Sequence, residues 1–522
     1  MQIAIAQFNY KAGDIAGNSE KIIAAIRQAE VQKAELIIFP ELAVCGALPQ
    51  DLLERESFIQ DCRLAIEKIS THCQRIAAIV GAPNLDIQNG IMYNSAYFMQ
   101  NGEVVDGVHK NILSDYDIFN ESRYFIAGED NTSIRYKNQN IRIIFDEYES
   151  EYIDKSDSLV IYIGMTPFTT ESLYNKEKIL SGIAQKYGKN IISVNHIGSS
   201  TSILFDGNSS VCNYKGKIVT RLKAFEEDLC IIDTNKLGSQ TPLSTTPGKK
   251  IELIHQALVA GIRDYFMKNG FTKAILGLSG GIDSAVVAAL AVEALGAENV
   301  MGLLMPSQYS TDHSVADALA LAENLGMPHT TIPIKDIYEQ YLEALKPQFQ
   351  DLPFNVTEEN LQARTRGMLV MAMSNKFGYI ALNTSNKSEA AVGYGTLYGD
   401  LCGSLGTIGD VYKTDIFLLA RHINKDRIII PEHTITKAPS AELHPDQKDQ
   451  DSLPEYGVLD AILKLYIEEN YTATMITDQG YPLQTVEKVI RMVRNNEYKR
   501  AQCPPILKVS KKAFGSGRKY PF

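Results

Sequence analysis

A glycine-rich segment that joins a strand to a helix constrains this chain more than any other feature of its sequence. Residues 274–287 read AILGLSGGIDSAVV, so an apolar strand leads into SGGIDS and an Ala/Val-rich helix follows. Adjacent glycines let the backbone approach a ligand closely, and amide groups at the start of a helix favour an anion. The segment therefore predicts a phosphate-binding loop. Its residues are Gly277, Leu278, Ser279, Gly280, Gly281, Ile282, Asp283 and Ser284.

The side chains of this loop suit a bound phosphate. Ser279 and Ser284 supply hydroxyl donors, and Asp283 can hold a divalent cation that bridges phosphate oxygens. The pattern GxxxxGK[ST] is absent, so this is not a Walker A loop. The loop resembles the SGGxDS segment of the N-type ATP pyrophosphatases, which cleave ATP between the α and β phosphates. That resemblance implies a Rossmann-like domain with a parallel sheet, and a glycine-rich turn without a ligand is the weaker alternative.

Three further segments narrow the resemblance. Residues 359–368 read ENLQARTRGM, residues 382–400 read LNTSNKSEAAVGYGTLYGD, and residues 438–443 read APSAEL, followed by DQKDQDSLPEYGVLD. All three resemble NAD synthetase, and residues 496–505, NEYKRAQCPP, resemble the closing substrate segment of that family. The likeness spans residue 251 to the C-terminus.

The resemblance implies a ligase reaction with ATP as co-substrate and Mg²⁺ as cofactor. The carboxylate of deamido-NAD attacks the α phosphate of ATP, giving an adenylate and pyrophosphate, and ammonia then displaces AMP. Taken alone, Arg364, Lys413 and Lys499 would be ordinary surface charges, and only their place in the family segments singles them out. The implied roles are Asp283 and Glu389 for magnesium, Thr384 and Lys413 with the loop for ATP, and Asn360, Arg364, Glu389, Asp400 and Lys499 for deamido-NAD.

The length of 522 residues favours more than one domain. Residues 235–250, NKLGSQTPLSTTPGKK, are rich in Ser, Thr, Pro and Gly and lack an apolar period, which indicates a linker. An amphipathic helix is predicted from Ile251 until Gly270 stops it. We therefore divide the chain into a domain at residues 1–240, a linker at 241–250 and a synthetase domain at 251–522.

The first domain reads as a layered α/β structure. Ile3–Phe8 has the pattern of a strand, and Asn18 is expected to cap the helix that follows. Turn residues at Asn101-Gly102 and Lys215-Gly216 predict two hairpins. Parallel and antiparallel pairing are both expected.

The same domain resembles the nitrilase-type amidohydrolase domain, an α/β sandwich that supplies ammonia in glutamine-dependent NAD synthetases. The matching segments are FPEL at residues 39–42, VHKNILSDYDIFNESRYF at 108–125 and FDG at 205–207. By this resemblance Glu41 is the general base, Lys110 the cation that stabilises the oxyanion, and Tyr116 the glutamine contact.

One essential group is missing from that domain. Amide hydrolysis by this route requires a thiolate nucleophile, which the family places at the end of a strand. The matching strand here is predicted at Ile141–Tyr148, and Phe145 stands at the nucleophile position. Cys45, four residues after Glu41, is a weak substitute because its offset does not match that strand. We therefore predict an inactive pseudo-amidase, and the synthetase would use free ammonia in place of glutamine.

Composition excludes several classes of protein. The net charge of −11 argues against nucleic acid as a partner. No segment has the apolar length of a membrane helix, the N-terminus does not resemble a secretory leader, and the seven cysteines are scattered. A cytoplasmic enzyme is expected, and the resemblance implies a homodimer or a larger homo-oligomer.

Two alternatives remain open. The first is a fully glutamine-dependent NAD synthetase whose nucleophile is not recognised in the sequence. The second is a non-catalytic nucleotide-binding or assembly protein, against which the intact SGGIDS and NTSNKSE segments argue.

Overall fold

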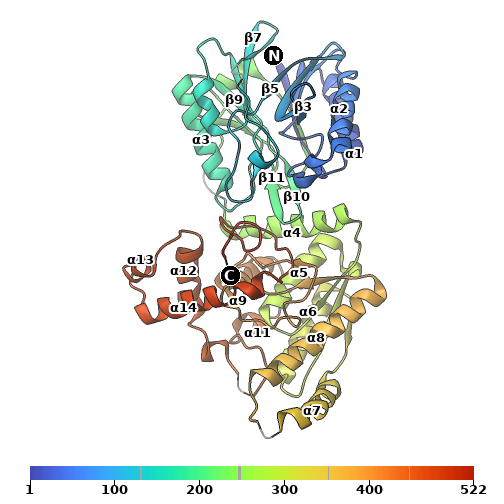
Figure 1. Ribbon diagram of the computed structural model, residues 1–522, viewed down its shortest axis with the longest axis vertical. Coiled ribbons are helices and arrows are strands. Elements are labelled where there is room, and N and C mark those ends of the chain that lie inside the picture. The colour runs from blue at the N-terminus through green and yellow to red at the C-terminus, as the bar shows by residue number, and fades with distance from the viewer. Residues whose placement is uncertain (130–131, 245–247, 351, 446, 522) are drawn as a thin grey trace. The chain divides into compact units, whose positions relative to one another are not determined.

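The computed structural model describes residues 1–129, 132–244, 248–350, 352–445 and 447–521. The chain divides into two compact units, residues 1–248 and residues 249–522, here called the N-terminal and C-terminal units (Figure 1). Both are α/β, which confirms the predicted fold class. Residues 245–247 of the predicted linker lie outside the described residues.

Two six-stranded sheets form the centre of the N-terminal unit, with strand orders β14-β1-β2-β3-β4-β5 and β13-β12-β9-β8-β7-β6. Each contains three parallel neighbours, β1-β2-β3 in one and β7-β8-β9 in the other, and the remaining pairs are antiparallel. A ribbon of β10 and β11 accompanies them. The strands are β1 Gln2–Gln7, β2 Leu36–Ile38, β3 Ala77–Asp86, β4 Ile91–Gln100, β5 Glu103–His109, β6 Ile134–Tyr136, β7 Gln139–Ile144, β8 Leu159–Tyr162, β9 Asn190–Ser193, β10 Ile197–Ser200, β11 Ile203–Asp206, β12 Ser210–Cys212, β13 Ile218–Arg221 and β14 Asp228–Asp233.

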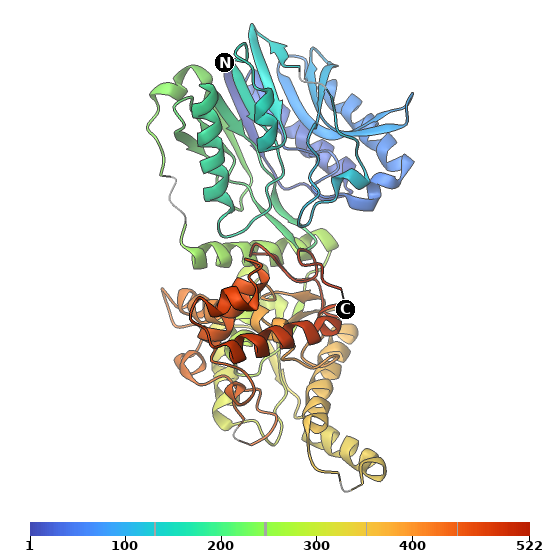
Figure 2. The same ribbon diagram turned by 60° about the vertical axis from the view of Figure 1, so that its left-hand side comes forward.

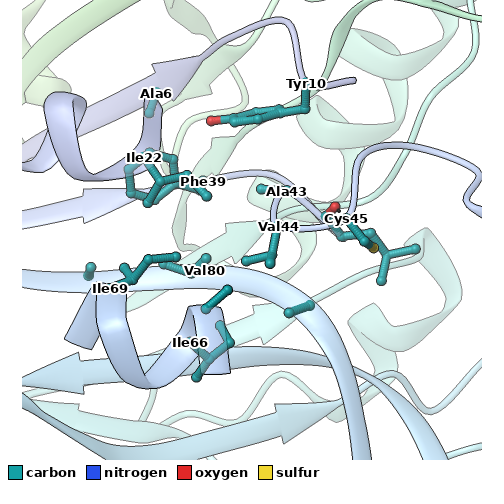
Figure 3. Packing of buried hydrophobic residues seen from close by; sticks show 14 of the residues in the cluster. Ala6, Tyr10, Ile22, Phe39, Ala43, Val44, Cys45, Ile66, Ile69 and Val80 are labelled. Carbon is teal, nitrogen blue, oxygen red and sulfur yellow. Dashed lines mark hydrogen bonds between the residues drawn. The ribbon is translucent and has the colours of Figure 1, made fainter. Parts of the chain in front are cut away.

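Helices cover the outer faces of this sandwich (Figures 1 and 2). Helices α1 (Ile15–Val31) and α2 (Glu56–Ser70) pack on the first sheet, and α3 (Ser172–Tyr187) packs on the second. Three apolar layers result. Ile5, Ile79 and Ile143 lie between the sheets. Ile22 of α1 and Val80 of β3 belong to the layer between the first sheet and its helices (Figure 3), and further apolar residues lie under α3.

Local predictions for this unit are mostly confirmed. Strand β1 matches the expected strand, and both expected hairpins are present. In the β4–β5 hairpin Asn101 and Gly102 have φ of 54° and 83°, left-handed values that suit a tight turn between twisted strands. Gly216, with φ of 73°, lies in the β12–β13 turn.

The predicted cap of α1 is wrong. The helix begins at Ile15, and the side chain of Asp14 accepts the hydrogen bond from the amide of Gly17. Asn18 lies inside the first turn, where its side chain is buried and bonds to the backbone of Lys11 and the carbonyl of Val44. These contacts with residues outside the helix set the role of Asn18.

A five-stranded parallel sheet forms the centre of the C-terminal unit, in the order β17-β16-β15-β18-β19. The chain proceeds from β15 outward to β17, then returns to the other side of β15 for β18 and β19. Open sheets of this kind bind ligands beyond the carboxyl ends of the strands, where the strand order reverses. The strands are β15 Ala274–Gly277, β16 Val300–Leu304, β17 His329–Thr331, β18 Ile380–Asn383 and β19 Leu405–Gly406.

The helices of this unit begin with α4, which Gly270 ends in a left-handed conformation as predicted. Helices α5 and α8 pack on β15, and α12 and α14 form a second apolar cluster with α9. Among the described residues, no helix is long and apolar enough to cross a membrane. The helices are α4 Lys250–Asn269, α5 Ile282–Leu295, α6 Asp312–Leu325, α7 Lys335–Phe349, α8 Val356–Phe377, α9 Lys387–Val392, α10 Lys413–Ile423, α11 Glu432–Thr436, α12 Tyr456–Ile467, α13 Ala473–Thr477, α14 Leu483–Asn495 and α15 Glu497–Arg500.

Candidate functional site

The SGGIDS loop leaves the carboxyl end of the central strand, β15, and ends in helix α5. Gly280 has a φ of +77°, and a Cβ atom there would lie 2.2 Å from the carbonyl oxygen of Ser314. Only glycine therefore fits, and its absence of a side chain brings the loop against the start of α6. The amide groups where α5 begins form a site that favours an anion.

Two hydroxyl groups complete the loop. The Oγ atoms of Ser279 and Ser284 lie 3.2 Å apart. Ser279 Oγ accepts a hydrogen bond from the amide of Gly281 at 3.2 Å, and Ser284 Oγ donates to the carbonyl of Gly281 at 3.0 Å. These bonds hold both hydroxyls within the loop.

A cavity of about 960 Å³ opens beside this loop. Helix α8, the ends of β15, β16 and β18, and residues 437–444 and 447–449 contribute to its walls. Gly280 and Arg364, both among the described residues, lie outside its lining. The residues singled out by sequence that line it are Gly277, Leu278, Ser279, Gly281, Ile282, Asp283, Ser284, Asn360, Thr384, Glu389, Asp400, Lys413 and Lys499.

Lys413, the first residue of α10, joins two acidic residues in the cavity wall. Its Nζ lies 2.5 Å from Asp283 Oδ2 and 3.2 Å from Glu389 Oε1. The side-chain amide of Asn386 donates to Asp283 Oδ1 at 2.8 Å. Burial acts to lower the pKa of Lys413, but the two carboxylates outweigh it and raise that pKa above its ordinary value. The ammonium therefore stays charged.

Glu389 owes its position to the start of α9. Its backbone amide donates to Asn386 Oδ1 at 3.0 Å, and its carboxylate accepts from the amide of Asn386 at 3.3 Å, which is a capping box. Burial raises the pKa of Glu389 to about 8; Lys413 opposes this shift, while Asp283 and Asp449 add to it. Glu389 therefore holds a proton near neutral pH while only Lys413 is beside it, and a further cation at this point would favour its ionised form.

Asp283 and Glu389 fit a magnesium ion by their chemistry. Mg²⁺ prefers oxygen ligands and often takes one or two protein carboxylates together with phosphate oxygens and water. Within the described part of the chain, no group of three His, Cys, Asp or Glu side chains could hold a metal ion. An ion held by these two carboxylates would therefore take phosphate oxygens and water as its other ligands.

A buried lysine anchors α9 from behind. Lys387 Nζ forms ion pairs with Asp410 at 2.9 Å and Glu468 at 2.8 Å. It also donates to Ser510 Oγ at 2.6 Å and to the carbonyl of Lys512 at 3.0 Å. The final segment of the chain thus helps to hold the helix that carries Glu389.

Asn360, Asp400 and Lys499, three of the residues expected to hold deamido-NAD, form another wall of the cavity. Thr396 Oγ1 donates to Asn360 Oδ1 at 2.7 Å, and its amide donates to Asp400 Oδ1 at 2.8 Å. Lys499 Nζ donates to the carbonyls of Gly393 and Gly395, both at 2.8 Å. Burial raises the pKa of Asp400 and lowers that of Lys499, an effect that Asp400 opposes.

The two arginines of α8 face different surroundings. Arg364 is exposed, and its Nε donates to the carbonyl of Leu397 at 3.2 Å. Arg366 lines the cavity, where its Nε donates to the carbonyl of Met305 at 3.0 Å. Burial lowers the pKa of Arg366 to about 10, against the opposing charges of Glu442 and Asp400. Arg366 therefore lies in the lining of the cavity, and Arg364 lies outside it.

Glu442 is a second residue that sequence reasoning missed. It lies in the APSAEL segment, and its Oε1 accepts hydrogen bonds from Ser314 Oγ at 2.6 Å and Thr311 Oγ1 at 3.0 Å. Its carboxylate thereby fixes one wall of the cavity to the start of α6. Because its partners lie about 130 residues earlier, no local pattern reveals this contact.

In the N-terminal unit, Lys110 also lies between two carboxylates. Its Nζ is 2.9 Å from Glu41 Oε1 and 2.8 Å from Glu121 Oε2. Asn94 Nδ2 donates to Glu41 at 2.6 Å, and the amides of Met165 and Ser114 donate to Glu41 and Glu121. Glu121 was not singled out from the sequence, although it lies in the segment that identified Lys110.

This cluster retains a proton as well as a positive charge. Burial raises the pKa of Glu41 to about 7; Lys110 opposes this shift and Glu121 reinforces it. Burial alone would lower the pKa of Lys110, but the two carboxylates raise it above its ordinary value. The base expected from the nitrilase resemblance is therefore present with its cation.

Comparison with known proteins finds a family in each unit. A carbon-nitrogen hydrolase family matches residues 2–241, and an NAD synthase family matches residues 254–503. A glutamine-dependent NAD(+) synthetase from Synechocystis sp. is 43% identical, covering 99% of this chain and 98% of that protein. One from Aquifex aeolicus is 39% identical, covering 100% and 99%. The chain belongs to the glutamine-dependent NAD(+) synthetases.

Solved structures agree with this assignment. The glutamine-dependent NAD+ synthetase from Acinetobacter baumannii is 38% identical with a TM-score of 0.81, covering 100% of this chain and 98% of that one. The enzyme from Cytophaga hutchinsonii is 22% identical with a TM-score of 0.87, over 100% and 97%, and shows the shared fold. The predicted pairing of a nitrilase-like domain with a synthetase domain is confirmed.

Phe145 follows strand β7 directly. Strand β7 ends at Ile144, so the predicted strand to Tyr148 is wrong beyond that residue. A 3-10 helix, Glu147–Tyr152, follows because Asp146 caps it. The Phe145 ring is buried between the two sheets, and its amide donates to Glu149 at 2.7 Å. An aromatic ring thus fills the position expected for a nucleophile.

Glu149 ties this point to the segment after Lys110. Its Oε1 accepts hydrogen bonds from the amides of Asn111 and Ile112 at 2.7 and 3.0 Å, while Oε2 accepts from Phe145. Burial raises the pKa of Glu149, and these amides act to lower it. The carboxylate therefore links the backbone at Phe145 to the backbone at Asn111 and Ile112.

Cys45 and Tyr116, the other two residues considered for this site, lie in different surroundings. Cys45 is fully buried in the apolar layer under α1 and α2 (Figure 3), and burial, with Cys62 adding to it, raises its thiol pKa well above the ordinary value. A thiolate is therefore strongly disfavoured there. Tyr116 is 61% exposed, with its ring edge against Phe119.

Proposed function

We propose that this chain is a NAD synthetase that amidates deamido-NAD with ATP and takes free ammonia as its nitrogen donor. The observation that carries the proposal is one cavity that unites the SGGIDS loop, the Asp283–Lys413–Glu389 cluster and the wall formed by Asn360, Asp400 and Lys499. A volume of about 960 Å³ is ample for a large nucleotide ligand.

In this proposal the two walls position two substrates. The SGGIDS loop, Thr384 and Lys413 hold ATP, and Asn360, Glu389, Asp400 and Lys499 hold deamido-NAD. Arg366 replaces Arg364 in the proposed contact set, because its guanidinium can bind a phosphate or carboxylate with two parallel hydrogen bonds.

The chemistry asks mainly for positioning and charge neutralisation. Loop amides and the Lys413 ammonium stabilise negative charge on the departing pyrophosphate while the deamido-NAD carboxylate attacks the α phosphate. Ammonia then attacks the adenylate carbonyl and AMP leaves. A magnesium ion held by Asp283 and Glu389 would neutralise phosphate charge.

The choice of ammonia rests on the N-terminal unit. Its base and cation remain in contact, but a phenyl ring cannot form the thioester that glutamine hydrolysis requires. The relatives are glutamine-dependent by name. A fully glutamine-dependent enzyme with a different nucleophile is therefore the second candidate.

A nitrogen-donor assay separates these two candidates. Purified protein receives ATP, Mg²⁺ and deamido-NAD with either ammonium or glutamine, and NAD and glutamate are measured. We expect NAD with ammonium and neither product above background with glutamine. Glutamine-supported synthesis with matching glutamate release would disprove the ammonia proposal, and Cys45→Ala would then show whether that thiol is responsible. Absence of NAD with both donors would favour a non-catalytic role.

The proposal includes a homodimer, or a larger assembly, in the cytoplasm. Helix α8 leaves large apolar side chains exposed, with Met368 at 65% and Phe377 at 58%, and a partner subunit would cover them. All seven cysteines are free, as expected for a reducing compartment. Light scattering of the wild type and of Met368→Glu tests the dimer, and a monomeric wild type would disprove it.

A further inference from the structure

Two tyrosines, the partly buried Tyr394 and the buried Tyr456, converge on one carboxylate at the edge of the cavity. Tyr394 OH donates to Asp449 Oδ1 at 3.0 Å, and Tyr456 OH donates to Asp449 Oδ2 at 2.8 Å. Tyr394 follows α9, Tyr456 begins α12, and Asp449 ends the cavity wall formed by residues 447–449. One buried carboxylate therefore joins three segments that are distant in sequence.

Tyr456 also contacts Lys413 of the charged cluster. The Nζ of Lys413 lies 5.3 Å from the centre of the Tyr456 ring, within the range of a cation–π contact. Tyr456 is thus held at both ends: its hydroxyl binds Asp449, and its ring lies beside the ammonium. Since both oxygens of Asp449 accept hydrogen bonds from phenols, its carboxylate holds the two tyrosine rings in place.

Lys413 must change partners if the proposed function holds. Its ammonium now binds the two carboxylates that a magnesium ion would require. A lysine side chain has a long, flexible stem, so an ammonium released from its ion pairs needs another contact to keep it directed into the cavity. The face of Tyr456 supplies such a contact, and it does not compete for the metal.

We propose that Tyr394, Asp449 and Tyr456 form a positioning clamp, which holds the Lys413 ammonium over the Tyr456 ring while it exchanges Asp283 and Glu389 for a phosphate of ATP. The clamp rests on the proposed function, because it assigns Lys413 to ATP. Its members act through Lys413 and touch no reacting atom.

A double-mutant cycle tests the clamp. The variants are Tyr456→Leu, Lys413→Met and the double variant, assayed for NAD formation with saturating ammonium. Tyr456→Leu should lower kcat roughly tenfold, the size of a desolvated cation–π contact, and change the KM for deamido-NAD less than about twofold. In the Lys413→Met background the same change should cost less than about twofold, because the partner is already lost. An equal loss in both backgrounds would overturn the clamp.

The hydroxyl contacts are tested separately. Tyr456→Phe and Tyr394→Phe keep the rings and remove one bond each to Asp449, so each should lower kcat about threefold. Tyr466→Phe is the matched control: it lies on the same helix, its hydroxyl contacts Arg494 outside the site, and it should behave as wild type. Thermal unfolding of each variant identifies losses that come from misfolding, and a loss of kcat in Tyr466→Phe equal to that in Tyr456→Phe would contradict the clamp.

Binding distinguishes failure of the clamp from failure of the proposed function. Calorimetry measures the dissociation constant of ATP with Mg²⁺ for the four proteins of the double-mutant cycle, which are the wild type, Tyr456→Leu, Lys413→Met and the double variant. This measurement does not require that NAD is formed. We expect Tyr456→Leu to weaken binding about fivefold in the wild-type background and not at all with Lys413→Met. A wild type that binds ATP but makes no NAD would disprove the proposed function, while the binding cycle would still decide the clamp.

Discussion

Each unit contains a lysine between two carboxylates, and the two clusters differ in what surrounds them. The Lys110 side chain is 3% exposed and its partners Glu41 and Glu121 are 0% and 7% exposed. The Lys413 side chain is also 3% exposed, but Asp283 and Glu389 are 18% and 16% exposed and line a large cavity. Lys110, Glu41 and Glu121 are shielded from solvent, and we call them the sealed cluster. Lys413, Asp283 and Glu389 line a cavity, and we call them the open cluster.

This difference teaches what distinguishes a retained ion cluster from a ligand site. Glu41 and Glu121 receive hydrogen bonds from Lys110, Asn94 and backbone amides on both of their oxygens. Removing one partner from such a buried cluster destabilises the folded protein, so the cluster can be retained for stability alone. Asp283 and Glu389 keep a face toward the cavity, where a substrate or an ion can replace the lysine.

The sharpest way to break the comparison is Asp283→Asn. Removing this charge from the open cluster should lower NAD synthesis on the order of a thousandfold, about 4 kcal/mol in the barrier. The unfolding temperature should fall as well, because the buried Lys413 ammonium loses the charge of one partner, so rates are compared well below that temperature. Initial rates of NAD formation measure the effect, with the exposed Glu343→Gln as control. A variant with near-normal activity would show that the open cluster is also merely structural.

Replacing the Phe145 ring tests the N-terminal unit, which contains the sealed cluster. Phe145→Cys should lower the free energy of unfolding by about 3 kcal/mol, since it leaves space between the sheets. Phe145→Leu should cost about 1 kcal/mol. We expect no glutamate release from glutamine in either variant, measured alongside denaturant unfolding. Glutamine hydrolysis by Phe145→Cys would show that the N-terminal unit lacks only its nucleophile.

Glu41 makes the sealed cluster sensitive to pH. Its pKa is about 7 in the folded protein and near 4.5 in the unfolded chain, so the folded state retains its proton more tightly. The resulting stabilisation is full below about pH 4.5 and is lost as the pH rises through about 7. The difference in unfolding free energy between wild type and Glu41→Gln should therefore fall from pH 5 to pH 8, by on the order of 2 kcal/mol. Urea unfolding at several pH values measures it, and a constant difference would mean that Glu41 is ionised throughout.

The smallest expected effect separates the two arginines of α8. Arg366→Gln should raise the KM for ATP or deamido-NAD about tenfold, because a charged donor in the cavity lining is shortened and neutralised. Arg364→Gln should change either KM less than about twofold. Steady-state kinetics with each substrate varied in turn measure these KM values. A larger increase for Arg364→Gln than for Arg366→Gln would show that Arg364 contacts the substrate.

The sequence predicted correctly those features whose cause lies within a few neighbouring residues. The SGGIDS loop combines a strand, two glycines and a helix start within a few residues, and Gly270 ends α4 by its own backbone preference. Asn18 was misassigned because Lys11 and Val44, and not its own helix, decide its role. Arg366, Glu121 and Glu442 escaped notice for the same reason. Each owes its place to a contact with another element, such as Met305 at the end of β16 for Arg366.

The hydrogen bonds of Lys387 limit the order in which the C-terminal unit can fold during its synthesis. Its hydrogen-bond partners Ser510 and Lys512 lie 123 and 125 residues further along the chain. A ribosome that has completed the loop, the sheet and both carboxylates of the open cluster has still not supplied them. Until they are made, a lysine destined for full burial lacks part of its surroundings, so the helix that carries Glu389 is secured among the last events of synthesis.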